Sequence, residues 1–289
     1  MKVFFIIVII IALICIAVLC ESRRELHKLR VTKYKINNRN VPTALKGKRF
    51  VFLSDYHEAC GGELNEEIVN SIDSVKPAAV LIGGDMLNGK KPMEDIFPAA
   101  DLISAIAEKY PVYYAFGNHE KKIKSDVYDT KQLWGEFTGR LHGKITFLMN
   151  ESVSLERLGL GNTTIYGLDI PLEYYARVSY PDLDGYKIAG LMGKRSPGEY
   201  AVLLGHAPDF IKGYESWGAD LVLSGHFHGG IVRLPFLGGM ISPRLKLFPK
   251  YDYGRYDIGS TTMIVTNGIG QHSIKIRIGN IPEIVVLDF

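Results

Sequence analysis

The chain has 289 residues, of which 47% are hydrophobic and 22% are charged. These fractions are ordinary for a folded protein and exclude a largely disordered chain. The net charge of +3 excludes the broad basic surface that marks nucleic-acid binders, so we expect no nucleic-acid partner. Two of the three cysteines fall within an N-terminal apolar run, which excludes a disulfide framework.

The first twenty residues predict a membrane anchor. The run from Val3 to Cys20 contains no charge and no proline. As a helix it is long enough to cross roughly 30 Å of hydrocarbon. It is longer than the roughly 7–15 apolar residues of a secretory signal, and no good A-x-A cleavage site closes it. We therefore expect residues 1–20 to be an uncleaved, single-pass transmembrane anchor, with a cleaved signal peptide as the alternative.

Charges on either side of this run bear on the orientation in the membrane. Arg23, Arg24, Lys28 and Arg30 follow the run, whereas Lys2 and the terminal amine precede it. The positive-inside rule gives the rest of the chain a slight preference for the cytoplasm. Short N-terminal tails can cross in either direction, so the side of the membrane stays open.

The remaining chain divides into a short arm and one domain. Residues 21–45 are basic and polar, and we expect a juxtamembrane arm that leads into a first strand. Residues 46–289 contain no repeat and no low-complexity linker, so we expect a single domain. Its first half alternates apolar strands with amphipathic helices. The strands are expected to end at Asp55, Asp85 and Asn118, and the helices to cover 64–75 and 96–108.

The second half of the domain is richer in strands. Short apolar runs predict strands at 163–168, 200–204, 221–223, 261–266, 273–278 and 283–287. Crossover helices come first and more nearly all-β sequence follows. This order predicts an α/β fold, a two-sheet β-sandwich flanked by helices in four αββα layers, preceded by the transmembrane helix.

Polar side chains follow the ends of the predicted strands, where open α/β sheets bind their ligands. They are Asp55, His57, Asp85, Asn118, His119, His206, His226 and His228. Taken singly, each has an ordinary structural explanation: Asp55 could cap a helix, and His206 could be a loop histidine. Their combination at one edge of the fold favours a metal site.

This donor set suits two divalent transition metals. Carboxylate, imidazole and amide oxygen together favour Mn, Fe, Zn or Ni rather than Ca alone, and the donors are too many for one ion. Two ions that share one carboxylate leave room for a bridging hydroxide, which attacks a phosphoryl group held by both metals. The turn from His226 to His228 could then serve both ions.

The order of these motifs resembles that of the calcineurin-like metallophosphoesterases. D-x-H, G-D, G-N-H-E, G-H and G-H-x-H follow one another as they do in that family, and the resemblance runs from about residue 48 to the C-terminus. The stretch G-H-F-H-G-G-I-V-R-L-P-F and the ending N-G-I-G…R-I-G-N-I-P-E-I resemble its membrane-anchored bacterial YkuE-type branch.

The resemblance implies a metal-dependent phosphoric ester hydrolase with a role for each motif residue. Asp55, His57 and His228 would bind one metal, Asn118, His206 and His226 the other, and Asp85 would bridge them. His119 would stabilise transition-state charge or protonate the leaving oxygen as a general acid. Manganese is the metal we expect to support activity in vitro. After Asp85 the chain reads M-L-N-G-K. It lacks the arginine of the V-D-R-G motif of protein Ser/Thr phosphatases, which argues against that activity.

The residues that select the substrate are expected within 233–255, which mixes apolar side chains with arginine and lysine. Arg233 and Arg244 are the candidate substrate-binding residues. The stretch could be a solvated loop packed on its own domain. Alternatively, it could be a lip that meets anionic membrane and admits a lipid-linked phosphate.

Three functions stay open. The first is a membrane-anchored phosphoesterase that hydrolyses a phosphodiester, phosphomonoester or pyrophosphate bond. The second is a lipid-linked pyrophosphate hydrolase of the UDP-diacylglucosamine type, and the third is a non-catalytic metal-binding scaffold. We favour the first, because a scaffold has no need of the full donor set together with His119. The expected partners are a phosphate ester and the membrane; the sequence indicates no obligate protein partner.

Overall fold

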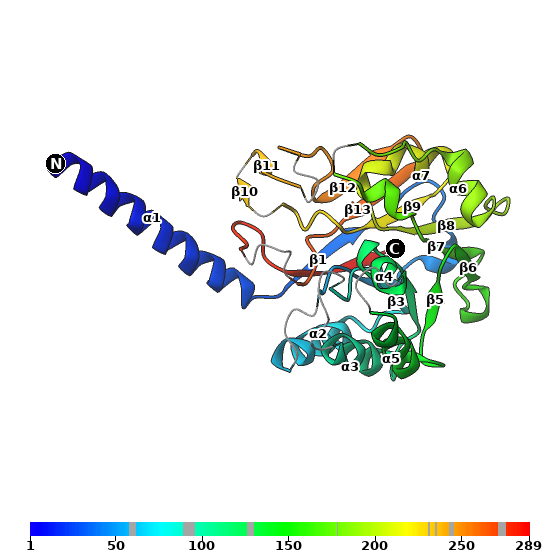
Figure 1. Ribbon diagram of the computed structural model, residues 1–289. Helices are drawn as coiled ribbons and strands as arrows, with labels where there is room; N and C mark the ends of the chain where they lie inside the picture. The colour runs from blue at the N-terminus through cyan, green and yellow to red at the C-terminus, as the bar shows by residue number, and fades with distance from the viewer. Residues whose placement is uncertain are drawn as a thin grey trace.

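The computed structural model describes residues 1–57, 62–88, 96–125, 130–177, 179–230, 232–234, 236–242, 246–270 and 276–289. Helix α1 (Lys2–Leu26) projects from one side of the domain (Figure 1). Its apolar window has a mean hydropathy of 3.7 and is not buried. This length and composition suit a membrane span, and an N-terminal signal sequence has the same properties.

Sheet one joins strands from both ends of the domain. In spatial order it contains β1 (Arg30–Lys35), β14 (Glu283–Asp288), β2 (Arg49–Leu53), β3 (Ala79–Ile82), β4 (Val112–Ala115) and β5 (Thr146–Leu148). The four strands from β2 to β5 are parallel, whereas β14 runs antiparallel to β2 and parallel to β1. Both faces of the sheet are covered, so its central strands are apolar throughout rather than alternating.

Sheet two has a parallel centre and antiparallel edges. Its order is β12 (Gly254–Ile258), β13 (Thr261–Val265), β9 (Leu221–Ser224), β8 (Tyr200–Gly205), β7 (Thr163–Leu168) and β6 (Glu151–Ser154). The strands from β13 to β7 are parallel, and β12 and β6 pair antiparallel at the two edges.

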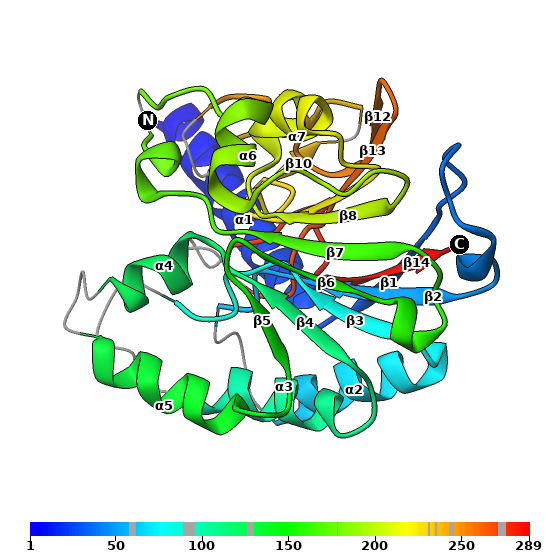
Figure 2. The same cartoon turned by 90° about the vertical axis from the view of Figure 1, so that its right-hand side faces the viewer.

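The two sheets pack face to face between two layers of helices (Figure 2). Side chains from both inner faces, such as Phe52, Leu81, Leu204 and Leu223, form the central core. The outer face of sheet one is covered by α2 (Glu63–Val75), α3 (Phe97–Ala107) and α5 (Lys131–Leu141). The outer face of sheet two is covered by α6 (Gly185–Met192) and α7 (Ile211–Trp217). The predicted α/β sandwich with helical outer layers is thus confirmed.

Shorter elements complete the described chain. They are α4 (Asn118–Lys124), the 3₁₀ turns Thr43–Leu45, Glu156–Leu158, Leu172–Tyr175 and Pro208–Phe210, and the two-stranded ribbon of β10 (Arg233–Leu234) and β11 (Gly238–Gly239).

The prediction of a strand ending at Asn118 is wrong in its boundary. β4 ends at Ala115, and Asn118 begins α4. The cause is Glu120, whose carboxylate accepts the Gly117 N–H at 3.0 Å and so fixes the first turn of the helix. Strands β2 and β3 likewise end before Asp55 and Asp85, which lie in the loops that follow.

The expectation of nearly all-β structure after the first half is also wrong, because α6 and α7 lie there. Both helices are short, and each buries few side chains, Ile188 in α6 and Ile211, Tyr214 and Trp217 among those in α7. So few buried positions produce little helical periodicity in the sequence. Of the expected strand 273–278, residues 273–275 lie outside the described chain, and Ile278 forms an isolated bridge.

The contact between α7 and the residues just before α6 can be tested with two glycines. A Cβ added at Gly213 in α7 would lie 1.8 Å from the carbonyl oxygen of Leu183, whereas one at Gly190 in α6 would meet nothing within 4 Å. We expect Gly213→Ala to destabilise the protein by about 1–3 kcal/mol through overpacking. Gly190→Ala should stabilise it by about 0.5–1 kcal/mol through helix propensity. Urea denaturation of both variants measures this; equal unfolding midpoints would contradict the close packing.

Candidate metal centre

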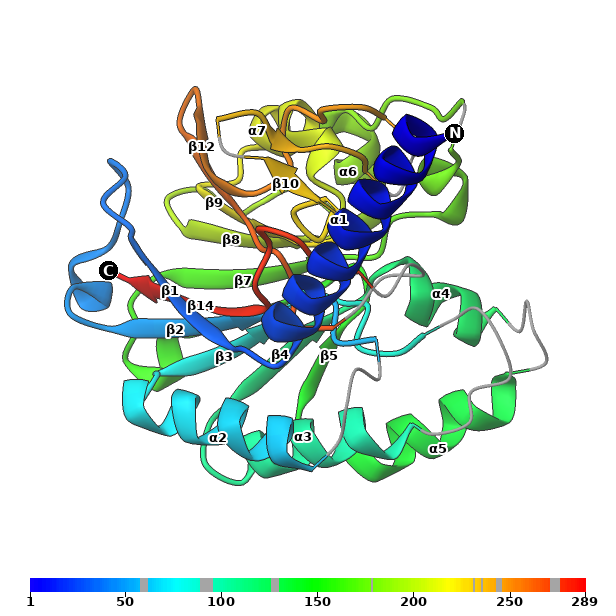
Figure 3. The same ribbon diagram turned by 90° about the vertical axis from the view of Figure 1, so that its left-hand side faces the viewer.

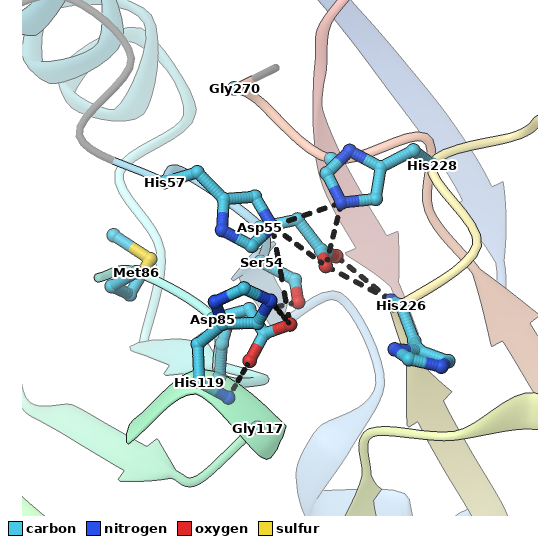
Figure 4. Close-up of polar contacts among 12 residues, drawn as sticks. Ser54, Asp55, His57, Asp85, Met86, Gly117, His119, His226, His228 and Gly270 are labelled. Carbon is cyan, nitrogen blue, oxygen red and sulfur yellow. Dashed lines mark hydrogen bonds and ion pairs between the residues drawn. The ribbon is translucent and has the colours of Figure 1, made fainter. Parts of the chain in front are cut away.

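The polar residues singled out from the sequence converge at one edge of the two sheets. The loops that follow β2 and β3 of sheet one and β8 and β9 of sheet two carry six of them, and the start of α4, after β4, carries Asn118 and His119. All of them are buried: Asp55, His57, Asp85, Asn118, His119, His206, His226 and His228. Figure 4 shows Asp55 and Asp85 with four of these histidines, His57, His119, His226 and His228. The arrangement follows from parallel strands, which bring their carboxyl ends to a common edge.

One group of donors is built around Asp55. The Oδ1 atom of Asp55 lies 3.2 Å from Nε2 of His228 and 3.9 Å from Nε2 of His57. The two imidazole Nε2 atoms lie 3.0 Å apart. The backbone N–H of His226 donates to both carboxylate oxygens of Asp55, at 3.0 and 3.1 Å. The loop after β9 therefore orients Asp55 as well as supplying His228.

A second group is built around Asp85. Its Oδ2 atom lies 3.0 Å from Nε2 of His206, 3.9 Å from Nε2 of His119 and 4.0 Å from Nε2 of His57. The other ring nitrogen of His206, Nδ1, lies 2.8 Å from the Gly83 carbonyl oxygen, which directs Nε2 toward the centre. Asp85 thus faces histidines from both sheets.

The donor set fits two metal ions. Three groups of donor atoms lie within 4.8 Å of one another, namely Asp55, His57 and His228; His57, Asp85 and His119; and Asp85, His206 and His226. Asn118 adds an amide oxygen, Oδ1, which is buried and accepts no hydrogen bond from the described residues. A buried oxygen of this kind costs free energy unless a donor or a cation satisfies it. Carboxylate oxygens, imidazole nitrogens and an amide oxygen together suit divalent transition metals.

The backbone at the centre adopts conformations that are rare outside glycine. Positive φ angles between 47° and 67° occur at Asp55, His57, Asp85, His226 and His228. Such residues cost about 1–3 kcal/mol each and cluster at functional sites. Two glycines allow the close approach of these loops. A Cβ at Gly117 would lie 2.1 Å from Oδ1 of Asp85, and one at Gly225 would lie 2.1 Å from Oδ2 of Asp55.

Charges within the centre shift the pKa values of its groups. Burial raises the pKa of Asp55 and of Asp85, but neighbouring imidazoles, His228 and His206 foremost, outweigh burial and lower both pKa values below their ordinary range. Burial, assisted by His228, lowers the pKa of His57 to about 4. Burial would also lower the pKa of His206, but Asp85 and Asp55 outweigh it and raise that pKa to about 9. Both carboxylates are therefore ionised at neutral pH, as cation binding requires.

Glu120 is a structural part of the centre that the sequence did not reveal. It is fully buried, and its carboxylate accepts the backbone N–H groups of Asp85, Met86 and Leu87 at 2.7, 2.7 and 3.1 Å. The hydroxyl of Tyr114 donates to it at 2.8 Å. Glu120 thus ties the Asp85 loop to the start of α4. Its place in G-N-H-E, directly after two candidate site residues, was the one signal available.

Of the two candidate substrate-binding arginines, the structure describes only Arg233. Arg244 lies outside the described residues. Arg233 lies in β10, where its Nη1 donates to Asp252 at 2.8 Å and to the Gly229 carbonyl at 3.1 Å. Its guanidinium also lies over the Tyr253 ring, 4.8 Å from the centroid. Arg233 therefore contacts the loop that carries His228, but Asp252 balances its charge.

The chain is similar to several known proteins. The calcineurin-like phosphoesterase profile matches residues 48–230. The chain is 26% identical over 270 residues to the uncharacterized metallophosphoesterase YkuE of Bacillus subtilis, covering 91% of this chain and 86% of that protein. It is 28% identical over 250 residues to phosphodiesterase YaeI of Escherichia coli, covering 83% and 81%. A solved dimetal phosphatase from Danio rerio aligns with 77% of this chain and 88% of its own, at 12% identity and a TM-score of 0.37.

The profile match covers more than half of the chain and contains every one of the candidate metal-binding residues. The resemblance to the YkuE-type proteins that the motifs indicated is confirmed. With its buried cluster of aspartates and histidines, the chain belongs to the calcineurin-like family of metallophosphoesterases.

Proposed function

We propose that this chain is a membrane-anchored, two-metal hydrolase of phosphate esters. The observation that carries the proposal is the position of Asp85, whose Oδ2 lies within 4.0 Å of imidazoles from both sheets. A carboxylate so placed can bridge two ions. Asp55, His57 and His228 would hold one ion, and Asn118, His206 and His226 the other. When bound, the ions would act as Lewis acids on the phosphoryl oxygens and supply a nucleophile at neutral pH.

His119 is the proposed proton donor to the leaving oxygen. Its backbone N–H donates to Oδ1 of Asp85 at 2.8 Å, and its ring packs edge-on against His57 with centroids 4.7 Å apart. The imidazole of His119 thus lies beside His57 and Asp85. A histidine there can protonate a departing alkoxide or stabilise its charge.

The bond that is cleaved is proposed to be a phosphodiester. Support comes from the relative of Escherichia coli, which carries the name phosphodiesterase. Monoester and pyrophosphate hydrolysis use the same metal chemistry, and a lipid-linked pyrophosphate is the narrower candidate. The scaffold alternative would bind metal as well, and it is disfavoured because a scaffold has no need of His119, whose Nε2 lies 3.9 Å from Oδ2 of Asp85.

Turnover by the full chain in detergent tests the proposed hydrolysis. We expect manganese-dependent cleavage of bis-p-nitrophenyl phosphate, with slower or no cleavage of p-nitrophenyl phosphate and of a nucleotide-linked lipid pyrophosphate. Asp85→Asn preserves volume but removes the bridging charge, and it should abolish turnover. Lack of turnover with Mn, Fe, Zn or Ni, from protein shown to be folded by circular dichroism, would favour the scaffold alternative. Preference for the lipid pyrophosphate would move the proposal to that bond.

Substitution of His119 tests its role as the acid. His119→Asn should lower kcat by about 10²–10⁴-fold for an alkyl phosphodiester. The loss should be smaller for the p-nitrophenyl ester, because its leaving group needs little protonation. Metal content, measured by inductively coupled plasma mass spectrometry, should equal that of the wild type. An equal loss on both substrates would assign His119 a role in positioning or charge stabilisation instead.

A surface near α1 is proposed to rest on the membrane. Phe236, Leu237, Leu247 and Phe248 are exposed, and Lys246 and Lys250 are exposed beside them. We call these six residues the apolar lip. The β10–β11 ribbon within this segment lies on the side of the domain from which α1 projects (Figure 1). Apolar side chains flanked by lysines suit the boundary of an anionic bilayer, and this placement supports α1 as a retained anchor.

Brominated lipids can report whether the apolar lip enters the bilayer. The full chain in nanodiscs with phosphatidylserine and brominated acyl chains would carry Phe236→Trp, or Tyr186→Trp as the control, since Tyr186 is an exposed aromatic on α6. The fluorescence added by Phe236→Trp should be quenched, and more strongly as the anionic lipid fraction rises. The fluorescence added by Tyr186→Trp should not be quenched. Equal behaviour of the two variants would contradict membrane contact by the lip.

A further inference from the structure

The last turn of α1 is bonded to the segment 277–280, near the other end of the chain. Ser22 and Glu25 are the buried residues of this mostly exposed helix. Oε1 and Oε2 of Glu25 accept the backbone N–H groups of Gly279 and Asn280, at 3.1 and 3.0 Å. The hydroxyl of Ser22 accepts the backbone N–H of Arg277 at 3.0 Å. Figure 3 shows the end of α1 beside this C-terminal segment.

The same segment fixes the loop that carries His228. The side-chain amide of Asn280 donates to the carbonyl oxygens of His228 and Gly230, at 2.5 and 2.6 Å. Asn280 is buried, so these bonds have no competition from bulk water. The carboxylate of Glu25 is therefore separated from the backbone of His228 by one residue, Asn280.

Arg277 makes a parallel connection to Asp55. The guanidinium is buried and donates to the carbonyl oxygens of Asn267, Gly268 and Gly270. Gly270 in turn donates its N–H to the carbonyl oxygen of Asp55 at 2.7 Å. Gly268 is packed so tightly that an added Cβ would lie 2.6 Å from Cβ of Asp55. The segment 277–280 thus reaches both Asp55 and His228.

The other donor group is fixed by different contacts. His206 is oriented by the Gly83 carbonyl, and the Asp85 loop is held by Glu120. These partners belong to sheet one and α4, and among the described residues no hydrogen bond links them to the last turn of α1. The end of the apolar helix is therefore connected most directly to the Asp55 half of the centre. The two halves still share backbone contacts, because the loop of His228 also carries His226 and the N–H of His57 donates to the Asp85 carbonyl oxygen at 3.1 Å.

We infer that Glu25 is a positioning residue for the Asp55–His57–His228 group, so that the end of the apolar helix sets the affinity of this half of the centre for its metal ion. The inference rests on the proposed two-metal function. Outer partners of metal ligands commonly change metal affinity by about 10- to 100-fold when they are removed. Glu25 acts at one further remove, through Asn280, so we expect the lower end of that range.

Metal titration of the full chain tests this inference. Isothermal titration with Mn²⁺ would compare the wild type with Glu25→Gln, which turns one acceptor into a donor facing a backbone N–H. The control is Glu21→Gln, on the same helix, where Glu21 pairs with Arg24 at the surface. The wild type should bind two ions. Glu25→Gln should weaken one of them about 10-fold and leave the other unchanged, and Glu21→Gln should weaken neither.

Each outcome has a distinct meaning. A wild type that binds fewer than two ions would contradict the proposed function itself. A wild type that binds two ions, with Glu25→Gln matching it, would overturn the positioning role. Should Glu25→Gln fail to fold, Ser22→Ala removes only the hydroxyl that accepts the Arg277 N–H, and the same selective weakening is expected from it. Equal weakening of both ions in the folded variant would also overturn the inference. The electron paramagnetic resonance signal of coupled Mn²⁺ pairs gives an independent count.

Discussion

Two carboxylates buried close to each other are the constraint on which the rest of the structure depends. Asp55 and Asp85 are almost inaccessible to water, and an unpaired buried charge costs several kcal/mol. Each is partly compensated by a backbone N–H, from His226 for Asp55 and from His119 for Asp85. The His226 donor follows β9 of sheet two and the His119 donor lies in α4 after β4, whereas the carboxylates follow β2 and β3. The loops of sheets one and two must therefore meet closely, and their left-handed residues follow from that requirement.

Surrounding residues keep those strained loops in place. Glu120 gathers the N–H groups of the Asp85 loop, and Arg277 gathers the carbonyl groups of the loop against Asp55. The Glu120 carboxylate is surrounded by hydrogen-bond donors, and the Arg277 guanidinium is surrounded by carbonyl acceptors. Burial lowers the pKa of Arg277 to about 10, yet it stays charged at neutral pH. Glu120 and Arg277 can affect the site without touching substrate, because each holds a strained backbone that would otherwise relax.

The sequence allowed the strands, the layers and the donors to be predicted because each leaves a local pattern. An apolar run followed by Asp55 or Asp85 marks a strand and its end within a few residues. The supporting contacts leave no such pattern. Glu25 and Asn280 are distant in sequence, and the Glu25 carboxylate accepts a backbone N–H, a group that every residue except proline possesses. The helices α6 and α7 were missed for the opposite reason, since they are too short for a period to emerge.

The position of β14 has a consequence for how the chain is made. This last strand lies between β1 and β2, which are among the first segments of the domain to be synthesised. Sheet one therefore cannot close until β14 has left the ribosome, which synthesises roughly 5–20 residues per second. The segment 277–280, directly before β14, arrives just as late. A nascent chain would thus contain its apolar helix long before the segment 277–280 could fix the loops of Asp55 and His228. Strand pairings so distant in sequence also form slowly. Closure of sheet one is therefore expected to come late, after β14 and the segment 277–280 have been synthesised.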